Sequence, residues 1–443
     1  MNNRYDRRAF LKLGASAGAG LATSSISPPV KANLPKGRAE RTVTAPINPV
    51  RIGFVGVGSR GSHHVRLLLK IKGVEIRAIC DIVQDKVTRA QRWVQEAGQP
   101  KPAGYSRGET DFERMCDRED LDLVYTATPW RWHVPVCVAA MKAGKHAATE
   151  VPAAITMDEC WQLVETSEKT NRHCVMMENC CYSRWMLMVL NMVRQGIFGE
   201  LLHGECGYLH DGRASVLSAG PRAKWITKHL IERNGDLYPT HGLGPLAQCM
   251  NINRGDQFDY LVSMGSNSRG LNLLAAKRFG ADSSQARQKY AQSDIVTTLI
   301  RTENGGTIIL KFDICSPRPY SRIDLVQGTK GIFRGYPEEK IYIEGRSPEH
   351  TWEATDKYRE EYEHPLWKAV GENGGMDYIE NYRLIKCLQT GAHPDMDVYD
   401  AAAWSAVSAL SERSIAGKSQ PIDFPDFTRG RWKTRQPLGI VQA

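Results

Sequence analysis

A glycine-rich segment placed directly after an apolar strand constrains this chain most. The segment Arg51–Gly61 runs from an apolar stretch into the pattern Gly56-x-Gly58-x-x-Gly61, and the helical run His64–Lys70 follows. In such a unit the first glycine permits a tight turn, the second lets the backbone approach a pyrophosphate, and the third allows close helix–strand packing. The helix N-terminus adds N–H donors and partial positive charge. The predicted phosphate-loop residues are Gly56, Gly58, Ser59, Arg60 and Gly61.

A glycine pattern alone is weak evidence for nucleotide binding, and a second predicted strand strengthens it. Val74–Cys80 is apolar and ends in Asp81, at about the spacing from the last glycine that dinucleotide-binding units show. A carboxylate there accepts hydrogen bonds from the adenosine ribose and repels a 2′-phosphate. The sequence therefore predicts a bound dinucleotide, NAD rather than NADP; the alternative is a glycine-rich turn without a ligand.

The order of predicted elements defines the fold class. Strands alternate with helices up to about residue 180, and long alternating runs typical of an antiparallel sheet then dominate. We predict an α/β protein: an N-terminal Rossmann domain with a doubly wound parallel sheet (residues 50–180), and a C-terminal α+β domain with a large, mostly antiparallel open sheet (residues 181–443). The open sheet is a candidate surface for a homo-oligomer. The runs assigned to it are Asp259–Ser266, Ile295–Thr302, Thr307–Ile314, Arg322–Gln327 and Lys340–Glu344, with a late helix at Ala401–Ile415.

The N-terminus carries an export pattern. Arg7-Arg8-Ala-Phe-Leu-Lys12 is a twin-arginine motif, a weakly apolar run follows, and small residues at Val30 and Ala32 offer a cleavage site. The run is too short and too rich in glycine, alanine and serine for a membrane span. We expect a signal peptide at 1–32, a linker at 33–49, and transport of the folded protein by the twin-arginine machinery to the periplasm, without a stable membrane anchor.

Charge and cysteine usage exclude several classes. The formal charge of +9 is modest for 443 residues, and basic and acidic residues are interspersed, so nucleic acid is not an expected partner. The eleven cysteines show no C-x-x-C pair and no zinc-type spacing, which predicts no metal site. Most lie in apolar runs, as buried free thiols do.

Further motifs carry a family resemblance that extends from Arg51 to the C-terminus. They are Trp130-x-x-His133, Glu150-Val-Pro-Ala-Ala154, Glu178-Asn-x-x-Tyr182 and Tyr238-Pro-Thr-His-Gly-Leu-Gly-Pro245. Together with the glycine segment, they resemble glycoside hydrolase family 109, within the glucose–fructose oxidoreductase/inositol dehydrogenase superfamily. Val151 stands where the dehydrogenases of that superfamily have a lysine that assists proton transfer, which argues against simple alcohol dehydrogenation.

The resemblance implies an NAD-dependent α-N-acetylgalactosaminidase acting on a small glycoside or on the terminal sugar of a glycan. NAD-dependent glycosidases are an exception to the usual use of two carboxylates. In this route tightly bound, recycled NAD oxidises C3 of the sugar, the C2 proton becomes acidic, the leaving group is eliminated, water adds, and C3 is reduced again. The reaction needs bases near C3 and C2 and an acid for the leaving group.

The resemblance also assigns residues. The catalytic candidates are His241, Tyr238 and Tyr182, and a tyrosine would need a cationic or hydrogen-bonding neighbour to act as a base. Packing is the alternative for Tyr238 and Trp130, and contact with solvent alone is the alternative for Arg222. Besides the loop and Asp81, the cofactor candidates are Trp130, His133, Glu150, Val151 and Asn179; the substrate candidates are Tyr208, Arg222, Tyr238, His241 and Tyr320.

Two other functions stay open at this point. The first is an exported NAD(P)-dependent sugar oxidoreductase of the glucose–fructose oxidoreductase type, in which a second substrate reoxidises the nucleotide. The second is a sugar-binding protein without catalysis. Val151 argues against the first function, and the intact Tyr238 and His241 argue against the second.

Overall fold

The computed structural model describes residues 45–441, so the predicted signal peptide and most of the predicted linker lie outside the described residues. The first sheet has six parallel strands in the order β3-β2-β1-β4-β5-β6. This order, which reverses between β1 and β4, is that of a doubly wound Rossmann sheet and confirms the predicted N-terminal fold. The strands are β1 Val50–Val55, β2 Val74–Cys80, β3 Ala103–Tyr105, β4 Leu123–Thr126, β5 His146–Thr149 and β6 Cys174–Met176.

The central strands of this sheet are buried on both faces. Every residue of β4 and β5 is buried, as expected for parallel strands covered by helices on each side. Helix α6 begins with a capping box, in which the side chains of Thr156 and Glu159 accept hydrogen bonds from each other's backbone N–H groups. The helices of this half are α2 Ser59–Leu68, α3 Gln84–Glu96, α4 Asp111–Cys116, α5 His133–Lys142 and α6 Met157–Thr170.

The second sheet has nine strands in the order β14-β13-β12-β11-β7-β10-β9-β8-β15. All pairs are antiparallel except β7 with β10, which confirms the mostly antiparallel prediction. The strands are β7 Leu201–Leu209, β8 Phe258–Gly265, β9 Val296–Thr302, β10 Thr307–Asp313, β11 Leu325–Gly328, β12 Gly331–Arg334, β13 Lys340–Ile343, β14 Glu353–Ala354 and β15 Ile422–Asp423.

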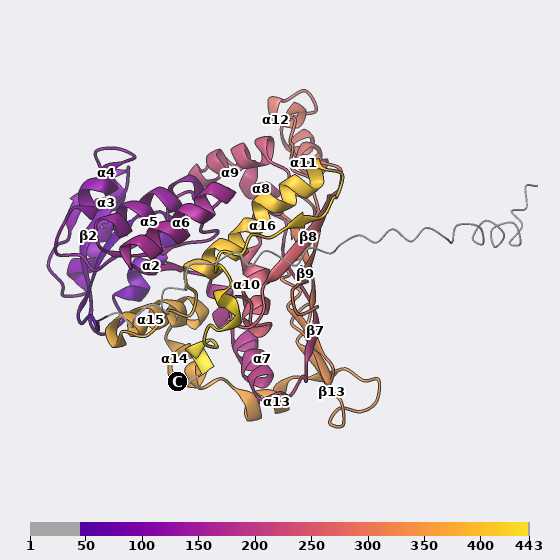
Figure 1. Cartoon of the computed structure of the whole chain (residues 1–443). Coiled ribbons are helices and arrows are strands. Elements are labelled where there is room, and N and C mark those ends of the chain that lie inside the picture. The colour runs from indigo at the N-terminus through magenta and orange to yellow at the C-terminus, as the bar shows by residue number, and fades with distance from the viewer. Residues whose placement is uncertain (1–44, 442–443) are drawn as a thin grey trace, which may run out of the picture. The chain divides into compact units, whose positions relative to one another are not determined.

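The two faces of the second sheet differ. On β9 the residues alternate between buried Ile300 and exposed Leu299, which is the pattern of a strand with one covered face. Helix α16 (Val398–Ala416) runs along the sheet beside β8, and α10 (Thr240–Cys249) contacts β7 (Figure 1). Other helices of this half are α7 Arg184–Arg194, α8 Arg213–Val216, α9 Pro221–Glu232, α11 Gly270–Phe279 and α12 Ser284–Arg287.

The last helices of the chain return to the first sheet. Helix α15 (Gly375–Thr390) packs against α2 and β1, while α16 packs against α6 and β6. The sequence did not predict α15, and α16 begins at Val398, three positions before the expected start, because Asp397 caps it. The remaining helices are α13 Asp356–Tyr362 and α14 Pro365–Val370, with short 3-10 helices at Trp130–Trp132 (η1), Asn179–Tyr182 (η2), Gly371–Asn373, Arg431–Lys433 and Gly439–Val441.

One predicted strand is partly wrong. The run Arg322–Gln327 becomes a strand only from Leu325 onward. Ile323 and Asp324 have φ values of +67° and +53°, in the left-handed region, so they cannot continue an extended strand.

The cysteine prediction is confirmed, since every cysteine of the chain is buried and has a free thiol. Among residues 45–441, helices long and apolar enough to cross a membrane are absent.

Candidate functional site

The glycine loop has the geometry of a phosphate cradle. Gly56 has φ +83°, and a Cβ on Gly61 would overlap the carbonyl oxygen of Gly56, so neither position tolerates a side chain. A Cβ on Gly58, in contrast, would meet nothing within 4 Å. Gly58 is also the N-cap of α2, which receives no side-chain capping bond and has no acidic residue in its first turn. The first N–H groups of α2 therefore suit the pyrophosphate of a dinucleotide.

Asp81 fixes this loop from the end of β2. Its Oδ2 atom accepts a hydrogen bond from the backbone N–H of Val57 at 2.9 Å, and its Oδ1 atom accepts one from Val83 at 3.0 Å. Each carboxylate oxygen has two lone pairs, so both can still accept a bond from a ribose hydroxyl. The Nζ atom of Lys86 lies 3.8 Å from Oδ1. The position agrees with the ribose-binding role predicted for Asp81.

A buried ionic network lies beside the loop. Glu150 Oε1 lies 2.7 Å from Nε of Arg60 and 2.6 Å from Nε2 of His64. Burial alone would raise the pKa of Glu150, but the charge of Arg60 and the bond to His64 outweigh it and lower that pKa well below its usual range. Asp377 of α15 joins the network, since its Oδ1 atom is 3.1 Å from Nη2 of Arg60 and accepts from Nδ2 of Asn179 at 2.6 Å. The structure thus brings together Arg60, Glu150 and Asn179.

Two other cofactor candidates, His133 and Val151, are buried in the Rossmann half of the chain. Nδ1 of His133 lies 2.7 Å from the carbonyl oxygen of Pro152, and Nε2 lies 2.9 Å from that of Thr128. His133 is buried. Through these two contacts it links the chain after β4 to the segment after β5, so its role is to position these segments. Val151 is buried in the hydrophobic core of the same region.

Several predicted substrate residues form one aromatic cluster. Tyr208 ends β7, and Tyr238 and His241 stand at the start of α10. The ring centroids are 4.7 Å apart for Tyr208 and Tyr238, 4.8 Å for Tyr238 and His241, and 5.3 Å for Tyr208 and His241. Tyr320 lies at the edge of the cluster, with its centroid 6.2 Å from that of Tyr208.

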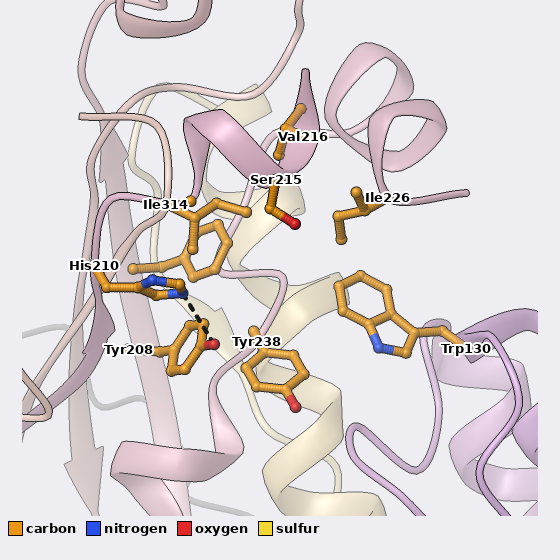
Figure 2. A pocket seen from close by; sticks show the side chains of 10 residues that line it. Trp130, Tyr208, His210, Ser215, Val216, Ile226, Tyr238 and Ile314 are labelled. Atoms are coloured by element: carbon orange, nitrogen blue, oxygen red, sulfur yellow. Dashed lines mark hydrogen bonds between the residues drawn. The ribbon is translucent and has the colours of Figure 1, made fainter. Parts of the chain in front are cut away.

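A cavity of about 60 Å³ opens beside this cluster (Figure 2). Trp130, predicted at the nucleotide, lies on its wall with its ring stacked 5.7 Å from that of Tyr238. The hydroxyl of Tyr208 is hydrogen-bonded to Nε2 of His210 at 3.0 Å, a partner that the sequence did not suggest. The cavity is lined by Trp130, Tyr208, His210, Gly212, Ser215, Val216, Ile226, Tyr238, Phe312 and Ile314.

His241 is paired with a buried carboxylate. Its Nδ1 atom lies 2.7 Å from Oε1 of Glu178, which is 0% exposed and also accepts from the N–H of Cys180 at 3.0 Å. Burial alone would raise the pKa of Glu178, but His241 outweighs it and the pKa is lowered. A carboxylate can only accept, so Nδ1 carries a hydrogen, and in the neutral imidazole Nε2 is then the acceptor. Glu178 belongs to the Glu178-Asn-x-x-Tyr182 motif but was not predicted as a site residue. Its place two residues after β6, at the carboxyl edge of the sheet, was the available signal.

One cluster at this site has metal-ligand atom types. Ligand atoms of Glu178, Cys180 and His241 lie within 4.8 Å of one another. In this arrangement Oε1 of Glu178 lies 2.7 Å from Nδ1 of His241 and accepts a hydrogen bond from the N–H of Cys180. These contacts are those of a His–carboxylate pair.

Of two further predicted site residues, the structure describes the side chain of one. Tyr182 is buried, and its hydroxyl donates to Oδ2 of Asp395 at 2.9 Å, with Arg383 pairing the same carboxylate. Because this hydroxyl is buried against Asp395, the geometry replaces the predicted catalytic role of Tyr182 with a structural one. Arg222 lies in α9, but its side chain is outside the described part of the structure.

Comparison with known proteins decides the family. A family model described as the C-terminal domain of glycosyl hydrolase 109 matches residues 182–434, and one described as an oxidoreductase-family, NAD-binding Rossmann fold matches residues 50–178. The chain belongs to glycoside hydrolase family 109. A family 109 protein of Solibacter usitatus (strain Ellin6076) is 48% identical over 447 residues, covering 98% of this chain and 100% of that protein. Glycosyl hydrolase family 109 protein 1 of Shewanella sp. (strain MR-4) is 46% identical, covering 99% of each.

Solved structures agree on the fold of this family 109 chain. An inositol dehydrogenase homolog from Azotobacter vinelandii, crystallised with NAD⁺, superposes with a TM-score of 0.66 at 18% identity, covering 86% of this chain and 98% of that one. The predicted family resemblance is therefore confirmed. The chain is an enzyme of a glycoside hydrolase family and has a domain that binds a nicotinamide cofactor.

Proposed function

We propose that this enzyme hydrolyses terminal α-linked N-acetylgalactosamine, from a small glycoside or a glycan, by oxidation and elimination with a recycled NAD. The observation that carries the proposal is the pairing of His241 with the buried Glu178 in a chain that has an NAD-binding Rossmann domain. The Glu178 carboxylate is bonded to His241, and the adjoining cavity is lined mainly by aromatic and apolar side chains. Hydrolysis by displacement needs two carboxylates flanking the bond, whereas the NAD-dependent route does not.

The chain's own residues fit the proton transfers of this route. When bound, NAD⁺ would accept a hydride from the sugar and later return it. Nε2 of His241 is the acceptor that would take the proton of the C3 hydroxyl, while Glu178 stabilises the resulting imidazolium. Tyr208 and Tyr238, whose rings pack on His241, are the candidates for contact with C2 and its neighbouring groups.

The proposal includes NAD rather than NADP and its retention through turnover. The Asp81 carboxylate stands where the ribose would lie and would repel a 2′-phosphate. Because the reaction returns the cofactor to its starting state, release is not required. The twin-arginine motif at Arg7-Arg8 supports export of the folded, loaded protein to the periplasm.

The uncovered face of the nine-stranded sheet supports a homo-oligomer as part of the proposal. Tyr260 and Met264 of β8 and Leu299 of β9 are exposed on this face, and an apolar sheet face of this kind suits a second copy of the chain. Light scattering of the purified protein measures this directly; a monomer at micromolar concentration would contradict it.

The functional test is an assay with an aryl α-N-acetylgalactosaminide and no added cofactor. Release of the aryl alcohol under these conditions is expected, because the nucleotide is carried by the enzyme. A requirement for a second sugar as electron acceptor, with an oxidised sugar as product, would instead establish the sugar oxidoreductase.

A further inference from the structure

A buried arginine stands behind the outermost tyrosine of the aromatic cluster. Arg322 is 3% exposed, and its Nη1 atom lies 3.1 Å from the hydroxyl oxygen of Tyr320. Its charge is balanced by Asp324, whose Oδ2 atom lies 3.3 Å from Nη2. Nε1 of Trp185 donates to the same carboxylate oxygen at 2.9 Å, and the guanidinium packs over the rings of Trp185 and Tyr336. The guanidinium is therefore held in a fixed direction toward Tyr320.

The backbone that follows Arg322 has an unusual conformation. Ile323 and Asp324 both have positive φ, an uncommon state for a β-branched residue such as isoleucine. The carbonyl oxygen of Ile323 accepts from the N–H groups of Gly335 and Tyr336, each at 3.2 Å. The side chains of Arg322 and Asp324, two positions apart, are both buried and paired.

The chemistry of the pair fixes the direction of the hydrogen bond. A guanidinium has only donors, so the hydroxyl oxygen of Tyr320 is the acceptor. The hydrogen of the Tyr320 hydroxyl must then point away from Arg322. Tyr320 is 43% exposed, and its ring centroid is 5.8 Å from that of His210, on the cluster side. The hydroxyl thus has a proton to give at the solvent edge of the site.

The position of Tyr320 matches the leaving group rather than the oxidised carbon. His241 is the deeper residue, with a side chain 15% exposed and held by Glu178 at the carboxyl edge of the first sheet. In the proposed function the sugar binds with C3 toward His241, so its aglycone would extend toward solvent. Tyr320, which is 43% exposed and contacts Tyr208, lies on the solvent side of the cluster.

We propose that Tyr320 is the general acid that protonates the leaving group, and that Arg322 is the positioning residue that orients and activates it. The inference rests on the proposed function. Once C3 is a ketone, a base of the cluster takes the C2 proton, the C2–H electron pair forms the C1=C2 bond, the C1–O bond breaks, and the departing oxygen takes the Tyr320 proton. Water then adds to C1 and gives a proton to the phenolate, the protonated base returns a proton to C2, and C3 is reduced again.

The charge of Arg322 favours this role, because it lowers the pKa of Tyr320 and so opposes the rise that burial causes. The net pKa stays above the usual value of a tyrosine. The negative charge that develops on proton transfer forms beside a buried cation, which stabilises it more than solvent-screened charge would.

The test compares the activity of each variant on a glycoside with a good leaving group and on one with a poor leaving group. Tyr320→Phe, Arg322→Lys and Arg322→Met are assayed on an activated dinitrophenyl glycoside and on the methyl glycoside of the same sugar. Tyr336→Phe is the matched control, since it also removes a hydroxyl from a tyrosine packed on Arg322. Nucleotide content of each purified variant reports folding.

Tyr320→Phe should lose about a hundredfold or more on the methyl glycoside and less than about threefold on the dinitrophenyl glycoside, because a good leaving group needs no proton. Arg322→Met should show the same selective loss, Arg322→Lys should recover part of it, and Tyr336→Phe should match the wild type. In Tyr320→Phe, recovered methyl glycoside deuterated at C2 should lose its label, because the C2 proton still exchanges while cleavage is blocked.

Equal losses on both glycosides, or none on either, in Tyr320→Phe would overturn the inference while leaving the proposed function intact. A merely structural Arg322 would lower both rates together. A wild-type enzyme that cleaves neither glycoside would remove the proposed function, and the inference with it.

Discussion

Nδ1 of His241 lies 2.7 Å from Oε1 of Glu178, although the two residues are 63 positions apart. Glu178 follows the last strand of the Rossmann sheet, and His241 begins a helix on the second sheet. The pair therefore joins the Rossmann half of the chain to the half that carries the second sheet, which is where the proposed mechanism needs a base. Its geometry is that of a histidine base oriented by a carboxylate.

The first prediction tests this pair. Glu178→Gln should lower turnover by about a hundredfold or more, because the amide leaves the imidazolium without its counter-charge. His241→Ala should lose at least as much, and both variants should keep their nucleotide, since neither residue touches the glycine loop. A loss well below about tenfold for His241→Ala would assign it a structural role.

The second prediction concerns the cofactor. Purified enzyme, denatured and assayed for released nucleotide, should yield NAD in near-stoichiometric amount. Asp81→Ala should weaken retention, because it removes both the ribose acceptor and the bond to Val57. Asp85→Ala, at an exposed position of the following helix, is the control. Release of NADP, or of no nucleotide from active protein, would contradict the prediction.

A third prediction follows from a buried carboxyl just before the catalytic segment. Asp236 is fully buried, and burial raises its pKa from 3.8 to about 7, although the backbone N–H of Tyr238 favours the charged form. The unfolded chain releases this proton at lower pH than the folded chain does. The free energy of unfolding should therefore fall as pH rises from about 4 to about 7 and stay lower above that range.

Asp236→Asn, which mimics the protonated acid, should remove this decline. The variant should exceed the wild type in stability at pH 8 by roughly 2 to 4 kcal/mol and differ little near pH 4. Urea unfolding across this range measures the effect. Parallel stability curves for Asp236→Asn and wild type would refute it, and the exposed Asp117→Asn should parallel the wild type.

The fourth prediction concerns export. Changing Arg7 and Arg8 to lysine should leave the precursor in the cytoplasm, because the transport machinery recognises the arginine pair and not charge alone. Fractionation of cells producing each form is the measurement. Undiminished periplasmic accumulation of the double variant would show that another route operates.

Sequence reasoning found the parts of the site that local patterns encode. The glycine loop and Asp81 follow from a strand–turn–helix unit, and His241 and Tyr238 follow from a motif. Sequence did not find α15, because Glu380 and Asn381 occupy buried positions in it and break the apolar period that marks a helix. Asp377, which pairs with Arg60, was missed for that reason.

The directions of individual side chains were a second feature that could not be predicted from the sequence. Tyr182 stands in a family motif, but its hydroxyl faces Asp395, a partner 213 positions away. Arg322 was assigned to a strand from its alternating neighbours, whereas Ile323 and Asp324 have left-handed backbone and the strand begins only at Leu325. A long-range contact decides the case of Tyr182 and backbone conformation decides that of Arg322, and an alternating apolar pattern encodes neither.

Loss of label from C2 of the sugar is the most direct measure of oxidation and elimination. An aryl α-N-acetylgalactosaminide deuterated at C2 is incubated with the enzyme in ordinary water, and the released sugar is analysed by mass. The proposed mechanism breaks the C2–H bond in every turnover, so the product should carry hydrogen at C2. Product that retains all of its deuterium would contradict elimination, because direct displacement at C1 is the route that never breaks that bond.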